Sequence, residues 1–84
     1  MNLDIRAQRP MTRDELGDFI ADLALAAAAS GHAWTNSSLD RYLEAASAWL
    51  LDMDGFFQNT GKEVPIAPTW QLIAQLLLAA RHYE

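Results

Sequence analysis

Three stretches of the chain place hydrophobic residues three and four positions apart, the spacing that puts side chains on one face of an α-helix. These stretches cover about residues 13–30, 38–54 and 69–83. The middle one has a broad apolar stripe made of Leu39, Tyr42, Leu43, Ala46, Trp49, Leu50 and Met53. The pattern predicts an all-α fold, a compact three-helix domain with a Pro-containing loop before the C-terminal helix.

The first predicted helix has clear signals at both ends. Thr12 followed by Glu15 is a capping box, in which each side chain bonds to the backbone N–H of the other residue. Ser30-Gly31 supplies a stop, because glycine readily adopts the left-handed conformation that ends helices. We therefore expect this helix to cover residues 13–30.

The middle helix is expected to end at Gly55, with Phe56 and Phe57 folding back afterwards. Asn36 and Asp54 then lie at opposite ends of this helix. A carboxylate at a helix C-terminus opposes the helix dipole, so Asp54 needs a local partner. We predict that both residues are structural polar anchors, bonded to backbone or loop groups.

The last predicted helix is apolar on nearly every side, which indicates burial against more than one neighbour. It follows a connection over residues 58–68 that contains two prolines. Either this helix lies between the other two helices and the loop, or it also buries Leu78 against a second subunit.

Residues 1–11 show only a weak alternation of apolar and polar positions. A lone short strand has no evident pairing partner in this chain. We predict an extended N-terminal arm over residues 1–11, followed by a single helical domain over residues 12–84.

Composition narrows the class of protein. Half of the 84 residues are hydrophobic and none is cysteine, which supports a packed core and excludes disulfides and thiolate metal sites. No secretory signal is visible, and the apolar runs are shorter than the roughly 20 residues of a membrane span. The net charge of −5 argues against nucleic-acid binding. We expect a cytoplasmic protein that binds neither nucleic acid nor membrane.

Acidic side chains line the outer face of the first predicted helix. They are Asp14, Glu15, Asp18 and Asp22. Like charges at four-residue spacing repel one another slightly, so helix stability does not explain the row. It is most simply a solvated face, and the sharper hypothesis is a contact surface for a basic partner.

Motifs that would carry chemistry are weak. Asp52-x-Asp54-Gly55 resembles the start of a calcium loop, but Phe56 and Phe57 occupy the positions that need an oxygen ligand and a glycine. No nucleophile elbow or phosphate loop accompanies the two histidines. We therefore predict no catalytic residue, no metal and no cofactor, and a protein that is not an enzyme. Trp34, Trp49 and Trp70 are assigned to the core.

Several motifs taken together resemble a known family. They are Trp34-x-Asn36, Tyr42-Leu43, Trp49-Leu50-x-Asp52-Met53-Asp54-Gly55-Phe56, Pro68-x-Trp70 and Ala79-Ala80-x-x-Tyr83-Glu84. Over about residues 12–84 the chain is similar to small stand-alone bacterial proteins classed as a domain of unknown function. The resemblance implies a cytoplasmic bacterial protein and carries no activity, cofactor or catalytic residue.

Three functions stay open. The leading hypothesis is a protein-binding module, an immunity or regulatory partner of a basic protein, which uses its acidic surface and the 56–68 loop. The second is a homodimer in which the last helix buries Leu78 across a dyad. The third is a small hydrolytic or metal-dependent enzyme, with His32 or His82 beside Asp52 or Asp54.

Overall fold

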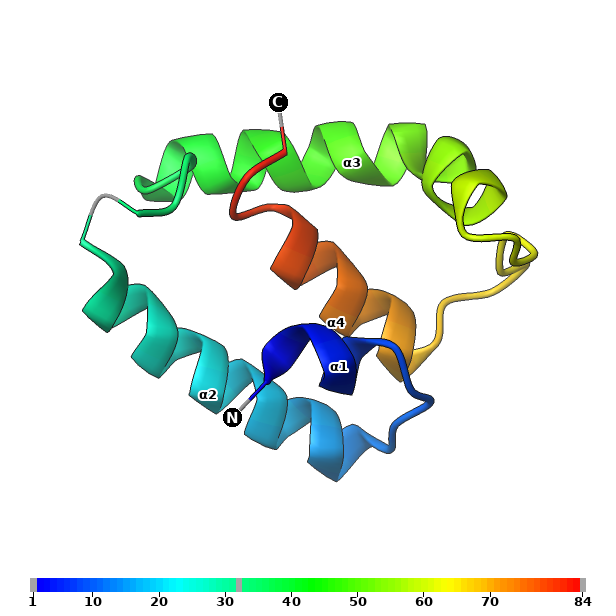
Figure 1. Ribbon diagram of the computed structural model, residues 1–84, viewed down its shortest axis with the longest axis horizontal. Helices are drawn as coiled ribbons and strands as arrows, with labels where there is room; N and C mark the ends of the chain where they lie inside the picture. The colour runs from blue at the N-terminus through cyan, green and yellow to red at the C-terminus, as the bar shows by residue number, and fades with distance from the viewer. Residues whose placement is uncertain (1, 32, 84) are drawn as a thin grey trace.

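The computed structural model describes residues 2–31 and 33–83, and within them it contains helices and no strand. The helices are α1 (Leu3–Ala7), α2 (Arg13–Ser30), α3 (Leu39–Asn59) and α4 (Trp70–Ala79) (Figure 1). The all-α prediction is confirmed, but the described chain has four helices where the sequence predicted three. None of these helices is long and apolar enough to cross a membrane.

The central element is α4, which contacts each of the other three helices. In Figure 1, α2 and α3 lie on opposite sides of α4, and α1 lies across the front of α4 and α2. Among the described residues, α2 and α3 make no contact with each other. Their relative position is therefore set through α4 and through the connector that joins them.

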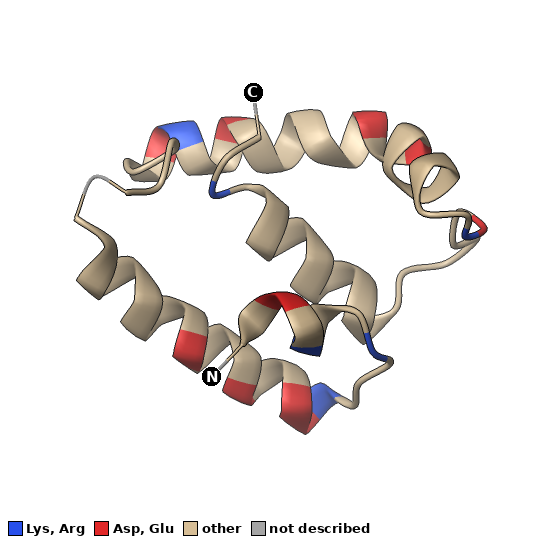
Figure 2. Cartoon of the chain, in the orientation of Figure 1, with Lys and Arg blue, Asp and Glu red and all other residues tan. Residues whose placement is uncertain are grey.

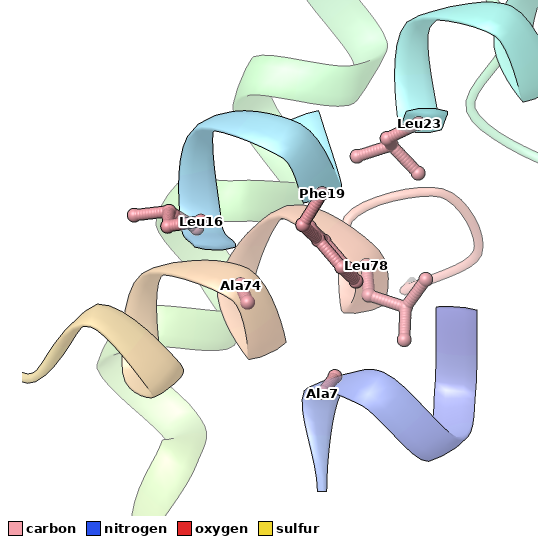
Figure 3. Packing of buried hydrophobic residues seen from close by; sticks show 6 residues of the cluster. All are labelled: Ala7, Leu16, Phe19, Leu23, Ala74 and Leu78. Carbon is pink, nitrogen blue, oxygen red and sulfur yellow. The ribbon is translucent and has the colours of Figure 1, made fainter. Parts of the chain in front are cut away.

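Buried side chains form two clusters that meet on α4. The larger cluster joins α1, α2 and α4, and Figure 3 shows its members Ala7, Leu16, Phe19, Leu23, Ala74 and Leu78. Phe19 is completely buried at its centre. The smaller cluster joins α3 to α4 through Trp49, Phe57 and Leu72. Each flanking helix thus buries its apolar side against α4, which explains why α4 itself is apolar on most sides.

The start of the chain differs from its prediction. Residues 3–7 form a helix where an extended arm was expected. Asn2 caps this helix by accepting from the Ile5 N–H, and Ala7 is buried against α2 and α4. A five-residue helix is too short to show a 3.6-residue period and depends on tertiary packing, so periodicity could not reveal it.

The predicted bounds of 13–30 for the first main helix agree with the structure, and its Thr12–Glu15 capping box is formed in both directions. The last helix is shorter than predicted, because α4 ends at Ala79 and turns follow to residue 82. Those turns place residues 80–83 against the connector between α2 and α3.

The prediction that the middle helix ends at Gly55 was wrong. The α3 helix continues through Gly55 to Asn59, and its stop is Gly61, which has a φ of 71°. The Lys62 N–H donates to the Phe57 carbonyl at 2.9 Å and the Gly61 N–H to the Gln58 carbonyl at 3.2 Å. These two bonds form a Schellman motif. Burial of Phe57 beyond Gly55 offsets the modest helix cost of that glycine.

We expect replacement by alanine to change the free energy of unfolding in opposite directions at the two glycines. Gly55→Ala should stabilise the protein by about 0.5–1 kcal/mol, because Gly55 is inside a helix with open space around its Cα. Gly61→Ala should destabilise it by about 1–2 kcal/mol, because the positive φ strains an L-residue. Urea unfolding measures both. A loss of stability in Gly55→Ala would contradict the continuous α3 helix.

Candidate functional site

One side of α4 is covered by no other described helix. Gln71 and Leu78 face α1, where the Gln71 Nε2 donates to the Ala7 carbonyl at 3.2 Å. Leu77 and Ile73 lie about 100° and 140° around the helix from Leu78, where both are partly buried against the cluster that α4 shares with α2. The shortest extent of the molecule, 17 Å, accommodates two helix layers with axes about 8–10 Å apart and leaves no room for a third. We call this uncovered side, between α2 and α3, the open face.

A groove of about 370 Å³ opens on this face between α2 and the start of α3. Leu77 and Trp34 lie at its base, and small or branched apolar side chains of α2 form one wall. That wall consists of Ile20, Leu23, Ala24 and Ala27. Leu39 and Tyr42 form the facing wall, and Ser37 and Ser38 lie at the polar end. The groove is thus mainly apolar and open to solvent.

The apolar surface continues along α3 beyond the groove. Leu39, Leu43, Ala46 and Leu50 follow one another at spacings of four, three and four residues. The three leucines are 75%, 57% and 45% exposed, respectively. We call these four residues the α3 stripe. Its spacing is the one by which two helices pack along their length.

Hydrogen bonds hold the connector between α2 and α3 against the end of α4. The Asn36 Nδ2 donates to the carbonyls of Ala80 and Tyr83, at 3.0 and 2.8 Å. The Asn36 N–H donates to the Arg81 carbonyl at 2.8 Å. Asn36 thus bonds to backbone groups, the kind of contact expected of it. It satisfies carbonyls that the end of α4 leaves without helical partners.

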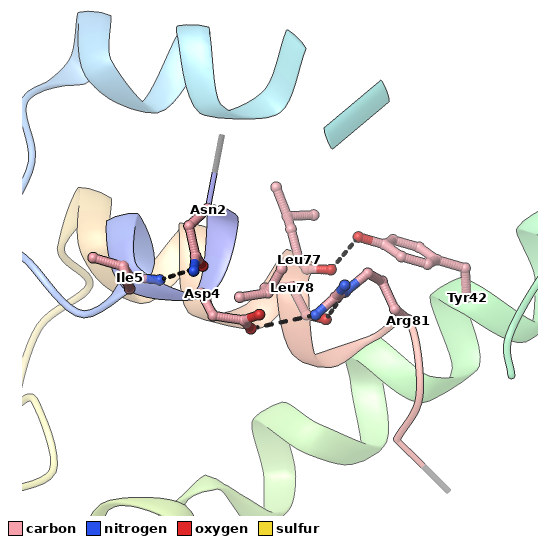
Figure 4. Close-up of polar contacts among 7 residues, drawn as sticks. All are labelled: Asn2, Asp4, Ile5, Tyr42, Leu77, Leu78 and Arg81. Atoms are coloured by element: carbon pink, nitrogen blue, oxygen red, sulfur yellow. Dashed lines mark hydrogen bonds and ion pairs between the residues drawn. The ribbon is translucent and has the colours of Figure 1, made fainter. Parts of the chain in front are cut away.

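Tyr42 and Arg81 add further contacts between α3, the connector and α4. The Tyr42 hydroxyl donates to the Leu77 carbonyl (Figure 4). Burial raises the pKa of Tyr42, so its hydroxyl remains a donor at neutral pH. The Arg81 guanidinium lies over the Trp34 ring at 5.7 Å and donates to the Leu78 carbonyl at 2.8 Å. These contacts fix the closed end of the groove.

The acidic row on α2 is divided by the fold. Asp22 pairs with Arg6 of α1 at 2.7 Å, and Glu15 is engaged in the capping box. Asp14 and Asp18 remain exposed, although Asp14 lies 3.6 Å from the guanidinium of Arg13. Figure 2 shows acidic residues along both α2 and α3. The structure therefore gives three of the four predicted surface residues a polar contact within the chain, and among the described residues Asp18 has none.

Asp54 does not lie at a helix end, contrary to the prediction. It is an exposed residue inside α3, and no described residue forms a hydrogen bond or ion pair with its side chain. The reason for expecting an anchor there, a carboxylate opposing the helix dipole at the terminus, disappears with the longer helix. Asp54 consequently remains a free charge on the surface of α3.

The residues considered for an enzyme site, Asp52 and His82, each form a hydrogen bond with a different part of the chain. The Tyr83 hydroxyl donates to Asp52 at 2.7 Å, and this bond raises the pKa of Tyr83. The Nδ1 of His82 accepts from the Thr35 N–H at 3.2 Å. His32 lies outside the described residues. Across residues 2–31 and 33–83, no group of three His, Asp or Glu is placed to hold a metal ion.

The sequence showed the broad apolar stripe of the middle helix but not which part of it another helix covers, so the open face was missed. Tyr42, Trp49 and Met53 do face α4, whereas Leu43 and Leu50 lie on the adjacent side. The apolar positions predicted for the middle helix span a wider face than one neighbouring helix can cover. That excess width was the sequence signal that some of these side chains are exposed.

Comparison with known protein families gives one match. Residues 12–84 match DUF7660, described as a family of unknown function. The chain therefore belongs to this family, and the resemblance to a domain of unknown function is confirmed. The comparison with curated proteins and that with solved structures each found no match.

The connector predicts a large effect of one polar substitution. Asn36→Ala removes two donors from backbone carbonyls and should lower the free energy of unfolding by about 1–3 kcal/mol. Ser37→Ala, at the exposed neighbouring position, is the matched control and should change it by less than about 0.5 kcal/mol. Urea unfolding measures both variants. Equal effects would show that the Asn36 side chain does not hold the connector.

Proposed function

We propose that this DUF7660 protein is a protein-binding module that receives a helix of another protein on its open face. The observation that carries the proposal is the exposed α3 stripe beside the groove between α2 and α3. Isolated exposed leucines are common on proteins, but a continuous row beside an apolar groove marks an interaction surface.

The shape of the open face favours a helix as its ligand. Amphipathic helices bind in grooves through apolar residues spaced three and four positions apart, and the α3 stripe presents the same spacing. Its length from Leu39 to Leu50 corresponds to about 17 Å of helix. The groove beside Trp34 and Tyr42 supplies a pocket for one larger anchoring side chain.

This proposal moves the binding surface away from the acidic row of α2. Asp22 and Glu15 serve contacts within the chain, and Asp14 and Asp18 are absent from the groove lining. We retain the broader role proposed for this protein: it is an immunity-like or regulatory partner of another protein in a bacterial cytoplasm, and it is not an enzyme. The bonding of His82 to Thr35 and of Asp52 to Tyr83 supports a structural use of these groups.

Self-association is the second candidate, because a stripe at this spacing can also pack against a copy of itself. The residue first considered for that contact is unsuitable. Leu78 is only 8% exposed and packs in the cluster shared by α1, α2 and α4. A dimer would have to use the α3 stripe instead.

A display library of amphipathic helical peptides, about 18 residues or 27 Å long, tests the proposal. We expect selected peptides to bind Leu43→Asp at least about tenfold more weakly than the wild type, because a buried charge opposes binding. Leu51→Asp is the matched control, since Leu51 lies on another side of α3 and is 82% exposed. Its affinity should not fall below that of the wild type. Tryptophan fluorescence, to which Trp34 in the groove contributes, reports binding.

Two results would overturn the proposal. One is a failure to enrich any peptide, or the enrichment only of peptides that bind both aspartate variants like the wild type. The other is a wild-type dimer in sedimentation equilibrium that dissociates in Leu43→Asp, which would assign the stripe to self-association. Circular dichroism should show the same helix content in all three proteins.

A further inference from the structure

Two unpaired acidic residues border the α3 stripe on its solvent side. Asp40 precedes Leu43 by three residues and Asp54 follows Leu50 by four, so each is a helical neighbour of an exposed leucine. With Ser47 between them, they form a line at seven-residue spacing. All three residues are exposed, and among the described residues neither acid belongs to an ion pair.

From this arrangement, and resting on the proposed function, we infer that the partner helix carries lysine or arginine at the two positions that face Asp40 and Asp54. The two acids are fourteen residues apart, or about 21 Å along α3. A helix packed along the stripe must pass both of them. The residues that flank the apolar seam of paired helices commonly select the partner by charge.

The requirements of the helix explain an acidic residue at position 40 but not one at position 54. Asp40 lies in the first turn of α3, where the helix dipole favours a negative charge. The Ser38 hydroxyl, followed by the Arg41 N–H, holds the pKa of Asp40 below its usual value, so the carboxylate is ionised at neutral pH. Asp54 lies more than one turn before the end of α3 and has no such reason to be acidic.

The same charges disfavour a second copy of the chain as the occupant. Antiparallel pairing that sets Leu43 against Leu50 of the second copy brings Asp40 close to Asp54 of that copy. Parallel pairing places the acids of the two copies on opposite sides of the seam, where only the overall net charge opposes association. The like charges that antiparallel pairing brings together repel, and the net charge of −5 adds to the repulsion. A basic helix is repelled neither by the two acids nor by the net negative charge.

The test uses one selected peptide synthesised in three forms, with lysine, glutamine or glutamate at the two flanking positions. At low salt we expect the lysine form to bind the wild type about three- to tenfold more tightly than the glutamine form, and the glutamate form to bind most weakly. Added salt should reduce these differences. The double variant Asp40→Asn, Asp54→Asn should bind all three forms nearly equally.

The matched control removes the same charge elsewhere. Asp14→Asn together with Asp18→Asn, on α2, should retain the preference for lysine. Loss of the preference in this control, or equal binding of all three forms to the wild type, would overturn the inference. Such a result leaves the proposed function standing if Leu43→Asp still abolishes binding of the glutamine form, so the two failures are distinguishable.

Discussion

The fold depends on one constraint: α2 and α3 do not touch, and each is held by the ten-residue helix α4. The three other described helices contact α4 without covering every side of it. Here α1 covers one side of α4, and α2 and α3 occupy the flanks. The remaining side stays open, so the candidate binding surface follows directly from the small number of helices.

Polar contacts compensate for the absent contact between α2 and α3. Asn36 and Tyr42 bond to backbone carbonyls of the second half of α4 and of the turn after it. Because these acceptors are carbonyls at fixed positions, the bonds define where the connector lies as well as how firmly it is held. The groove consequently has one closed, hydrogen-bonded end, while the rest of the open face is lined mainly by apolar side chains.

Local signals in the sequence were reliable where they acted alone. The Thr12–Glu15 box gave the start of α2 correctly, because capping depends on residues three apart. Gly55 led to the wrong end for α3, because the burial of Phe57 against α4 outweighs the cost of a glycine inside a helix. Only the folded chain shows that burial. Periodicity likewise placed Leu43 and Leu50 on the apolar face of the middle helix, but it could not show that α4 covers only the adjacent side of α3. The position of α1 was invisible for the same reason: its packing is tertiary.

Under the proposed function, the two acids beside the α3 stripe would govern the choice of partner. An exposed row of leucines invites association with any apolar surface, including that of another copy. In the proposed complex, Asp40 and Asp54 would make such contacts costly for acidic partners and favour basic ones. The apolar residues would then supply most of the affinity and the acids the choice of partner, since exposed charges add little binding energy but discriminate between surfaces. In this arrangement Asp54, which the helix itself does not require, acquires a physical reason for its position.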